Sequence, residues 1–72
     1  MSETVEALVT KMRASSLSFR QRGNEYKARL ANESNIKNQI LYAGDASSAF
    51  SSEATLDCLA NIFEEVFNKE ET

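Results

Sequence analysis

The feature that most constrains the fold of this chain is a regular spacing of apolar and small residues over its first thirty positions. From Val5 onward these residues recur at alternating steps of four and three. Such steps keep residues on one face of an α-helix. This face, here called the N-terminal seam, consists of Val5, Val9, Met12, Ser16, Phe19, Gly23, Tyr26 and Leu30. The spacing predicts a helix with a single packing face.

Two positions of the N-terminal seam, Ser16 and Gly23, carry small residues. A small residue on a helix lets a neighbouring backbone or ring approach closely. A glycine also costs about 1 kcal/mol relative to alanine in a helix interior. We therefore expect Gly23 to be either a packing notch or the point at which this helix bends.

A second amphipathic pattern occupies the last third of the chain. Its apolar residues cover one broad side of a helix, and acidic residues and asparagine cover the other. This C-terminal stripe consists of Leu56, Leu59, Ala60, Ile62, Phe63, Val66 and Phe67. It spans roughly 160°, wider than a helix needs for packing on one neighbour, and it predicts contacts on two sides. Cys58 falls among the polar residues and is expected to be partly exposed.

The segment between the two patterns sets the expected boundaries. Three asparagines lie between positions 32 and 38, and their side chains compete for backbone hydrogen bonds. A helix continuous from 5 to 43 would be about 58 Å long, too long to pack against itself. We expect a first helix over about 3–43 that is kinked, weak or broken near 32–35.

The end of this first helix is expected at Gly44, because glycine suits the position after a helix C-terminus. A loop over 44–51 would follow. Ser51 or Ser52 would then cap the N-terminus of a last helix over about 52–69.

Composition narrows the fold class. The 72 residues include no proline and only two glycines, which favours helices over a sheet. One cysteine and no histidine can form neither an internal disulfide nor a structural zinc site. Small scaffolds usually need such a staple or a second copy. We predict a single all-α domain, a helical hairpin or small helical bundle, which assembles as a homo-oligomer.

Catalysis is not expected. There is no histidine to act as a general base near neutral pH. Cys58 has no histidine partner to activate it, and no glycine-rich phosphate loop is present. We predict a non-enzymatic protein with no cofactor and no metal. The single cysteine fits the cytoplasm, and an acidic N-terminus without a long apolar run predicts no membrane segment.

Charge divides the chain into a basic and an acidic part. Residues 11–37 hold seven basic and two acidic residues, a net charge of +5. Residues 45–72 hold one basic and seven acidic residues, a net charge of −6. Antiparallel packing of a basic helix on an acidic one would explain this division. Exposed pairs of this kind contribute about 0–1 kcal/mol each.

The basic residues also suggest a ligand. Arginine binds phosphate in a bidentate fork, and aromatic rings offer a stacking surface for a base. A small anionic nucleotide-type ligand held between subunits would use Arg13, Phe19, Arg20, Arg22, Tyr26, Lys27 and Arg29. Duplex DNA is not expected, since the chain has a net charge of −3 and no known DNA-binding motif.

The favoured hypothesis is a binding or regulatory protein, such as an inhibitor, that acts through its helix faces on a protein partner. Its apolar helical surface exceeds what a two-helix hairpin can cover. The residues expected to form the oligomer and to engage the partner are Val5, Val9, Met12, Ser16, Gly23, Leu30, Leu56, Leu59, Ile62, Phe63, Val66 and Phe67.

Overall fold

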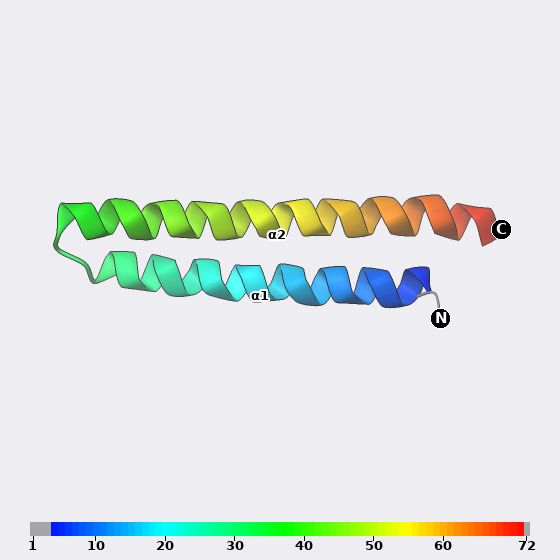
Figure 1. The fold of residues 1–72 in the computed structure, drawn as a ribbon, viewed down its shortest axis with the longest axis horizontal. Helices are drawn as coiled ribbons and strands as arrows, with labels where there is room; N and C mark the ends of the chain where they lie inside the picture. The colour runs from blue at the N-terminus through cyan, green and yellow to red at the C-terminus, as the bar shows by residue number, and fades with distance from the viewer. Residues whose placement is uncertain (1–3, 72) are drawn as a thin grey trace.

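The computed structural model describes residues 4–71, and the side chains of residues 4–67. Helix α1 runs over Val5–Ala31 and helix α2 over Ile36–Glu71. The two helices lie side by side and antiparallel, and they form a rod of 55 × 20 × 15 Å (Figure 1). The prediction of an all-α helical hairpin is confirmed.

The chain reverses between the helices at residues 32–35. The side chain of one asparagine caps the end of α1, and that of another caps the start of α2. At the end of α1, the Asn32 side-chain amide donates to the carbonyl of Ala28 at 3.2 Å. At the start of α2, the Asn35 carboxamide oxygen accepts from the backbone N–H of Lys37 at 2.9 Å. These side chains satisfy helix ends instead of extending a helix. The break expected near 32–35 is confirmed, and it is a complete reversal.

The predicted loop over 44–51 is wrong, as are the helix bounds that depended on it. Helix α1 ends at Ala31 instead of 43, and α2 begins at Ile36 instead of about 52. Gly44 lies inside α2, and neither glycine has a positive φ. Continuation of α2 buries Ala46 and Ala49 against α1, and this packing outweighs the helix-breaking tendency of glycine. The proposed N-cap at Ser51 or Ser52 is likewise absent, since both lie inside the helix.

The N-terminal seam is the face of α1 that packs against α2. Val9, Ser16 and Gly23 are buried, and the other five seam residues are half-buried. Outside the seam, Leu8 is the one half-buried residue of α1, and the others are exposed. The sequence pattern therefore identifies the packing face correctly, and its neighbour is the second helix of the same chain.

Gly23 is a packing notch. Helix α1 continues through it, and a β-carbon placed there would lie 2.6 Å from ring atoms of Phe50. No side chain tolerates so close a contact without a shift of its neighbour. The Phe50 ring thus lies directly on the α1 backbone.

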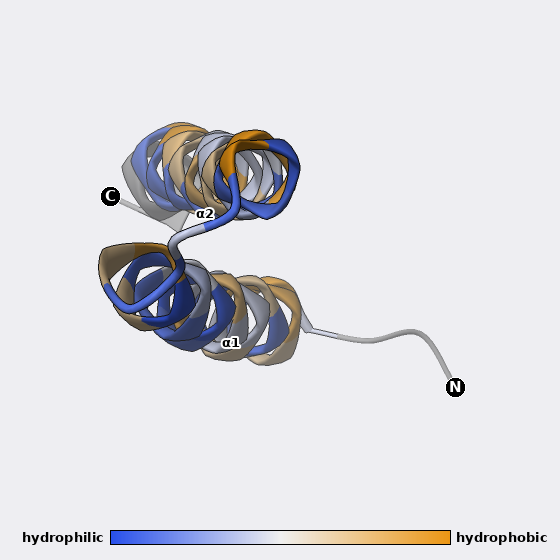
Figure 2. Ribbon diagram, turned by 90° about the vertical axis from the view of Figure 1, so that its left-hand side faces the viewer, coloured by the Kyte–Doolittle hydropathy of each residue, from blue (hydrophilic) through white to orange (hydrophobic). Residues whose placement is uncertain are grey.

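The buried core is small. Among the described residues, the buried apolar side chains are Val9, Ala46, Ala49 and Ala60. Small residues let two helices approach closely, but each buries little apolar area, whereas fully burying a leucine or phenylalanine contributes about 1.5–3 kcal/mol. Figure 2, which looks along the hairpin from its turn, shows apolar segments on the side of α2 turned away from α1.

Candidate functional site

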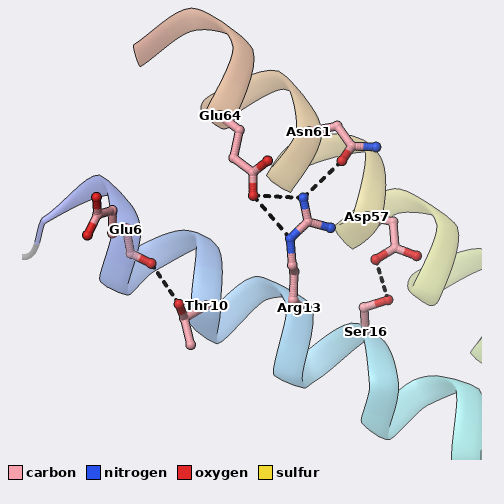
Figure 3. A network of polar contacts seen from close by, with 7 residues as sticks. All are labelled: Glu6, Thr10, Arg13, Ser16, Asp57, Asn61 and Glu64. Carbon is pink, nitrogen blue, oxygen red and sulfur yellow. Dashed lines mark hydrogen bonds and ion pairs between the residues drawn. The ribbon is translucent and has the colours of Figure 1, made fainter. Parts of the chain in front are cut away.

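A ladder of polar contacts joins the two helices towards the open end of the hairpin. Arg13 binds the carboxylate of Glu64 at 2.8 Å and the side-chain oxygen of Asn61 at 3.0 Å (Figure 3). About one turn further along α1, the hydroxyl of Ser16 donates to the Asp57 carboxylate at 2.8 Å (Figure 3). Basic α1 therefore packs against acidic α2, as the division of charge suggested.

Arg20 extends this ladder by pairing with Glu53. The hydrogen bond to Glu53, with the negative charge of that carboxylate, raises the pKa of Arg20 above its ordinary value. Arg13 and Arg20 were both candidate ligand-binding residues. Each is instead occupied by a carboxylate of the opposite helix.

Three other candidate ligand residues lie over aromatic rings. The guanidinium of Arg22 lies 5.4 Å from the centre of the Phe19 ring, and that of Arg29 lies 5.7 Å from the Tyr26 ring. The ammonium of Lys27 lies 5.8 Å from the Phe50 ring. Contacts of this geometry attract a cation to the ring face.

The structure brings three of the seven candidate ligand residues to one hollow. This hollow of about 180 Å³ is lined by Phe19, Arg22, Tyr26, Asp45, Ser48 and Ala49. Small-molecule sites typically measure about 300–1,000 Å³, and the Asp45 carboxylate opposes an anion. The hollow in a single hairpin is therefore smaller than a typical small-molecule site.

The C-terminal stripe is divided between two environments. Ala60 is buried, and Leu56, Phe63 and Phe67 are half-buried on the side of α1. Leu59, Ile62 and Val66 are exposed at 40%, 50% and 46%. One side of the stripe meets α1, as the wide pattern predicts for one of its two contacts, and the other side has no neighbour within the described hairpin.

The exposed side of the stripe continues along α2 towards the turn. This mostly exposed line, here called the outer face of α2, consists of Leu41, Gly44, Ser48, Ser51, Ser52, Thr55, Leu59, Ile62 and Val66. It contains no charged residue over its whole length. Ile36, Ile40 and Leu41, near the turn, are more than 60% exposed.

Sequence reasoning missed the turn-proximal part of the outer face. It assigned Leu41 to the first helix and Ser48 to a loop, so their shared face was not visible. The signal was nevertheless present, because steps of three and four run from Leu41 to Val66 once the helix is treated as continuous.

A shallow hollow lies between the edge of the outer face and Phe19 of α1. It has a volume of about 420 Å³ and is lined by Phe19, Ser48, Ser51, Ser52, Thr55 and Leu56. A second hollow, of about 410 Å³, lies at the open end of the hairpin beside Arg13 and Glu64. The first is bordered by hydroxyl and apolar side chains. The second is bordered by the paired Arg13 and Glu64 and by apolar side chains that include Val5, Val9 and Phe67.

These features define a two-helix antiparallel hairpin with an uncharged outer face. Over residues 4–71, no three potential metal-ligating side chains gather in one place, and neither helix carries an apolar stretch suited to crossing a membrane. Cys58 is exposed, as predicted. We compared the chain with models of known protein families, with curated proteins and with solved structures, and none of them matched.

Proposed function

We propose that this chain is a non-enzymatic binding protein that self-associates and acts on a protein partner through its helix faces. The observation that carries the proposal is an inversion of side-chain size. Six of the seven large apolar residues exposed in the described chain lie on α2, whereas the buried apolar residues are one valine and three alanines.

The apolar core of the hairpin is too small to contribute much stability by itself. A single core in a chain of this length rarely supplies more than about 3–5 kcal/mol, and this core lacks large buried apolar side chains. Association would bury the exposed residues of the outer face and supply the missing apolar burial. Exposed apolar surface of this kind is typical of interaction sites.

The proposal is tested by the solution mass from light scattering coupled to size-exclusion chromatography. A mass that is a multiple of the 8.0 kDa chain, with a melting temperature that rises with protein concentration, is the expected result. Ile62→Glu should reduce the mass to that of the single chain. Gln21→Glu, which adds the same charge at an exposed position of α1, should leave it unchanged.

A monomeric wild-type protein over the whole measurable concentration range contradicts self-association. The partner search would then use the hairpin itself as bait, with Ile62→Glu as the matched variant that loses a partner bound at the outer face.

A small anionic nucleotide-type ligand is the second candidate, supported by the meeting of Phe19, Arg22 and Tyr26 at one hollow. A second copy would have to enlarge this hollow and add cations. Isothermal titration with cyclic nucleotides tests the idea, with Arg22→Glu as the variant expected to abolish the heat. No heat at tens of micromolar wild-type protein would exclude ligands of that affinity.

A further inference from the structure

We propose that the outer face of α2 pairs with the same face of a second copy, with the two helices antiparallel about a twofold axis near Ser51 and Ser52. This inference rests on the self-association proposed above and adds its geometry.

The order of residues along the outer face is symmetric. From Leu41 the steps are three, four and three to Gly44, Ser48 and Ser51, and from Ile62 backwards the same steps lead to Leu59, Thr55 and Ser52. In a twofold dimer, if one residue contacts a second, the second contacts the first on the other copy. An antiparallel pairing therefore places Leu41 against Ile62 of the partner subunit.

The same pairing places Gly44 against a large side chain. A β-carbon at Gly44 would meet no atom within 4 Å, so no contact inside the hairpin requires glycine there. Glycine is among the least favourable residues in a helix interior. Opposite Leu59 of the partner subunit, Gly44 would form the hole that receives this side chain, as Gly23 receives Phe50 within the hairpin.

The centre of the face suits a close approach of two helices. Ser48, Ser51, Ser52 and Thr55 have short side chains and border the hollow of about 420 Å³. The face carries no charge that would have to be stripped of water on association. From Leu41 to Ile62 it extends for about 32 Å at 1.5 Å per residue, which gives the pairing the length of a full-sized helix contact.

Charge decides between the antiparallel and the parallel arrangement. The half of the hairpin next to the turn, residues 21–51, holds four basic and three acidic residues, a net charge of +1. The remaining described residues, 4–20 and 52–71, hold four basic and seven acidic residues, a net charge of −3. Antiparallel pairing sets each positive half beside the negative half of its partner, and such complementarity fixes orientation and register.

Cysteine cross-linking in a Cys58→Ser background tests this geometry. Ser52→Cys lies next to the axis, so oxidation should give a disulfide-linked dimer of twice the chain mass. Ala43→Cys is the matched control, since Ala43 is exposed, lies on a different side of the helix from the proposed face at about 100° per residue, and should stay unlinked. Leu41→Cys and Ile62→Cys should each remain unlinked alone and should cross-link when the two proteins are mixed.

The outcomes separate this inference from the proposed function. A dimer by mass in which Ser52→Cys stays unlinked, or in which Leu41→Cys alone forms a cross-link, overturns the antiparallel pairing and leaves self-association intact. A chain that is monomeric by mass and unlinked in every variant overturns both. Circular dichroism of each variant verifies that the helices are retained.

Discussion

The ring of Phe50 lies on the backbone of α1 at Gly23, where a β-carbon would come within 2.6 Å of the ring atoms. The ammonium of Lys27, one turn further along α1, lies over the same ring. This contact joins the middle of one helix to the middle of the other. At either glycine of the chain, this is the closest contact that an added β-carbon would make.

Gly23→Ala should therefore destabilise the hairpin. Alanine favours helix by about 1 kcal/mol over glycine, but its methyl group must displace the Phe50 ring, at a cost of roughly 1–3 kcal/mol for overpacking. Urea denaturation followed by circular dichroism measures the net effect. Asn24→Ala, at the neighbouring exposed position, is the control and should be neutral or stabilising. A stabilised Gly23→Ala variant would show that the ring does not occupy this notch.

Ser16→Ala should cost about 1–2 kcal/mol. Ser16 is only 2% exposed, and its hydroxyl donates to the Asp57 carboxylate at 2.8 Å. Removal of the hydroxyl leaves a half-buried carboxylate with one fewer donor, which costs more than the loss of an exposed hydrogen bond. Ser15→Ala, at an exposed position, is the comparison for chemical denaturation. If the two variants were equally stable, the Ser16 hydroxyl would be solvated and would not bind Asp57.

Arg13→Gln should have a smaller effect that depends on salt. Arg13 and Glu64 have side chains 42% and 45% exposed, and exposed pairs contribute at most about 1 kcal/mol. The difference in melting temperature between wild type and Arg13→Gln should shrink towards zero at 1 M salt, where charges are screened within about 3 Å. A difference that persists at high salt would assign the effect to packing of the arginine stem.

Gly44→Leu should abolish the proposed dimer and leave the hairpin folded. Within one chain a β-carbon at this exposed position meets no atom within 4 Å, so the helix content should be retained. In the dimer the added side chain would collide with Leu59 of the partner subunit. Light scattering should give the mass of one chain for Gly44→Leu and of two chains for Ala43→Leu, a control at the adjacent exposed position, which points to a different side of the helix. A dimeric Gly44→Leu protein would place the interface elsewhere.

The amino-acid sequence by itself determined the packing face of α1 and the position of a break in the helix near 32–35, but not that the chain reverses there. The spacing from Val5 to Leu30 identifies residues that the structure buries or half-buries, because a helix of fixed period puts them on one side. The side chain of Asn32 caps the end of α1 and that of Asn35 caps the start of α2. This effect is local and can be predicted from the sequence. Both results depend on neighbours along the chain.

The continuity of α2 was decided only by the tertiary structure. Gly44 and the serines that follow it are local signals for a helix end, and read alone they predict the loop that the structure lacks. Burial of Ala46 and Ala49 against α1 adds a favourable contribution that no local pattern contains.

Which apolar residues of α2 are exposed was also decided only by the tertiary structure. The C-terminal stripe is one pattern in sequence, yet α1 covers Phe63 and leaves Ile62 exposed, because periodicity identifies a face and not its neighbour. The sequence likewise did not decide whether the basic residues bind an anionic ligand or pair with acidic residues of the other helix. Arg13 and Arg20 bind Glu64 and Glu53, residues distant in sequence that become adjacent only when the hairpin closes.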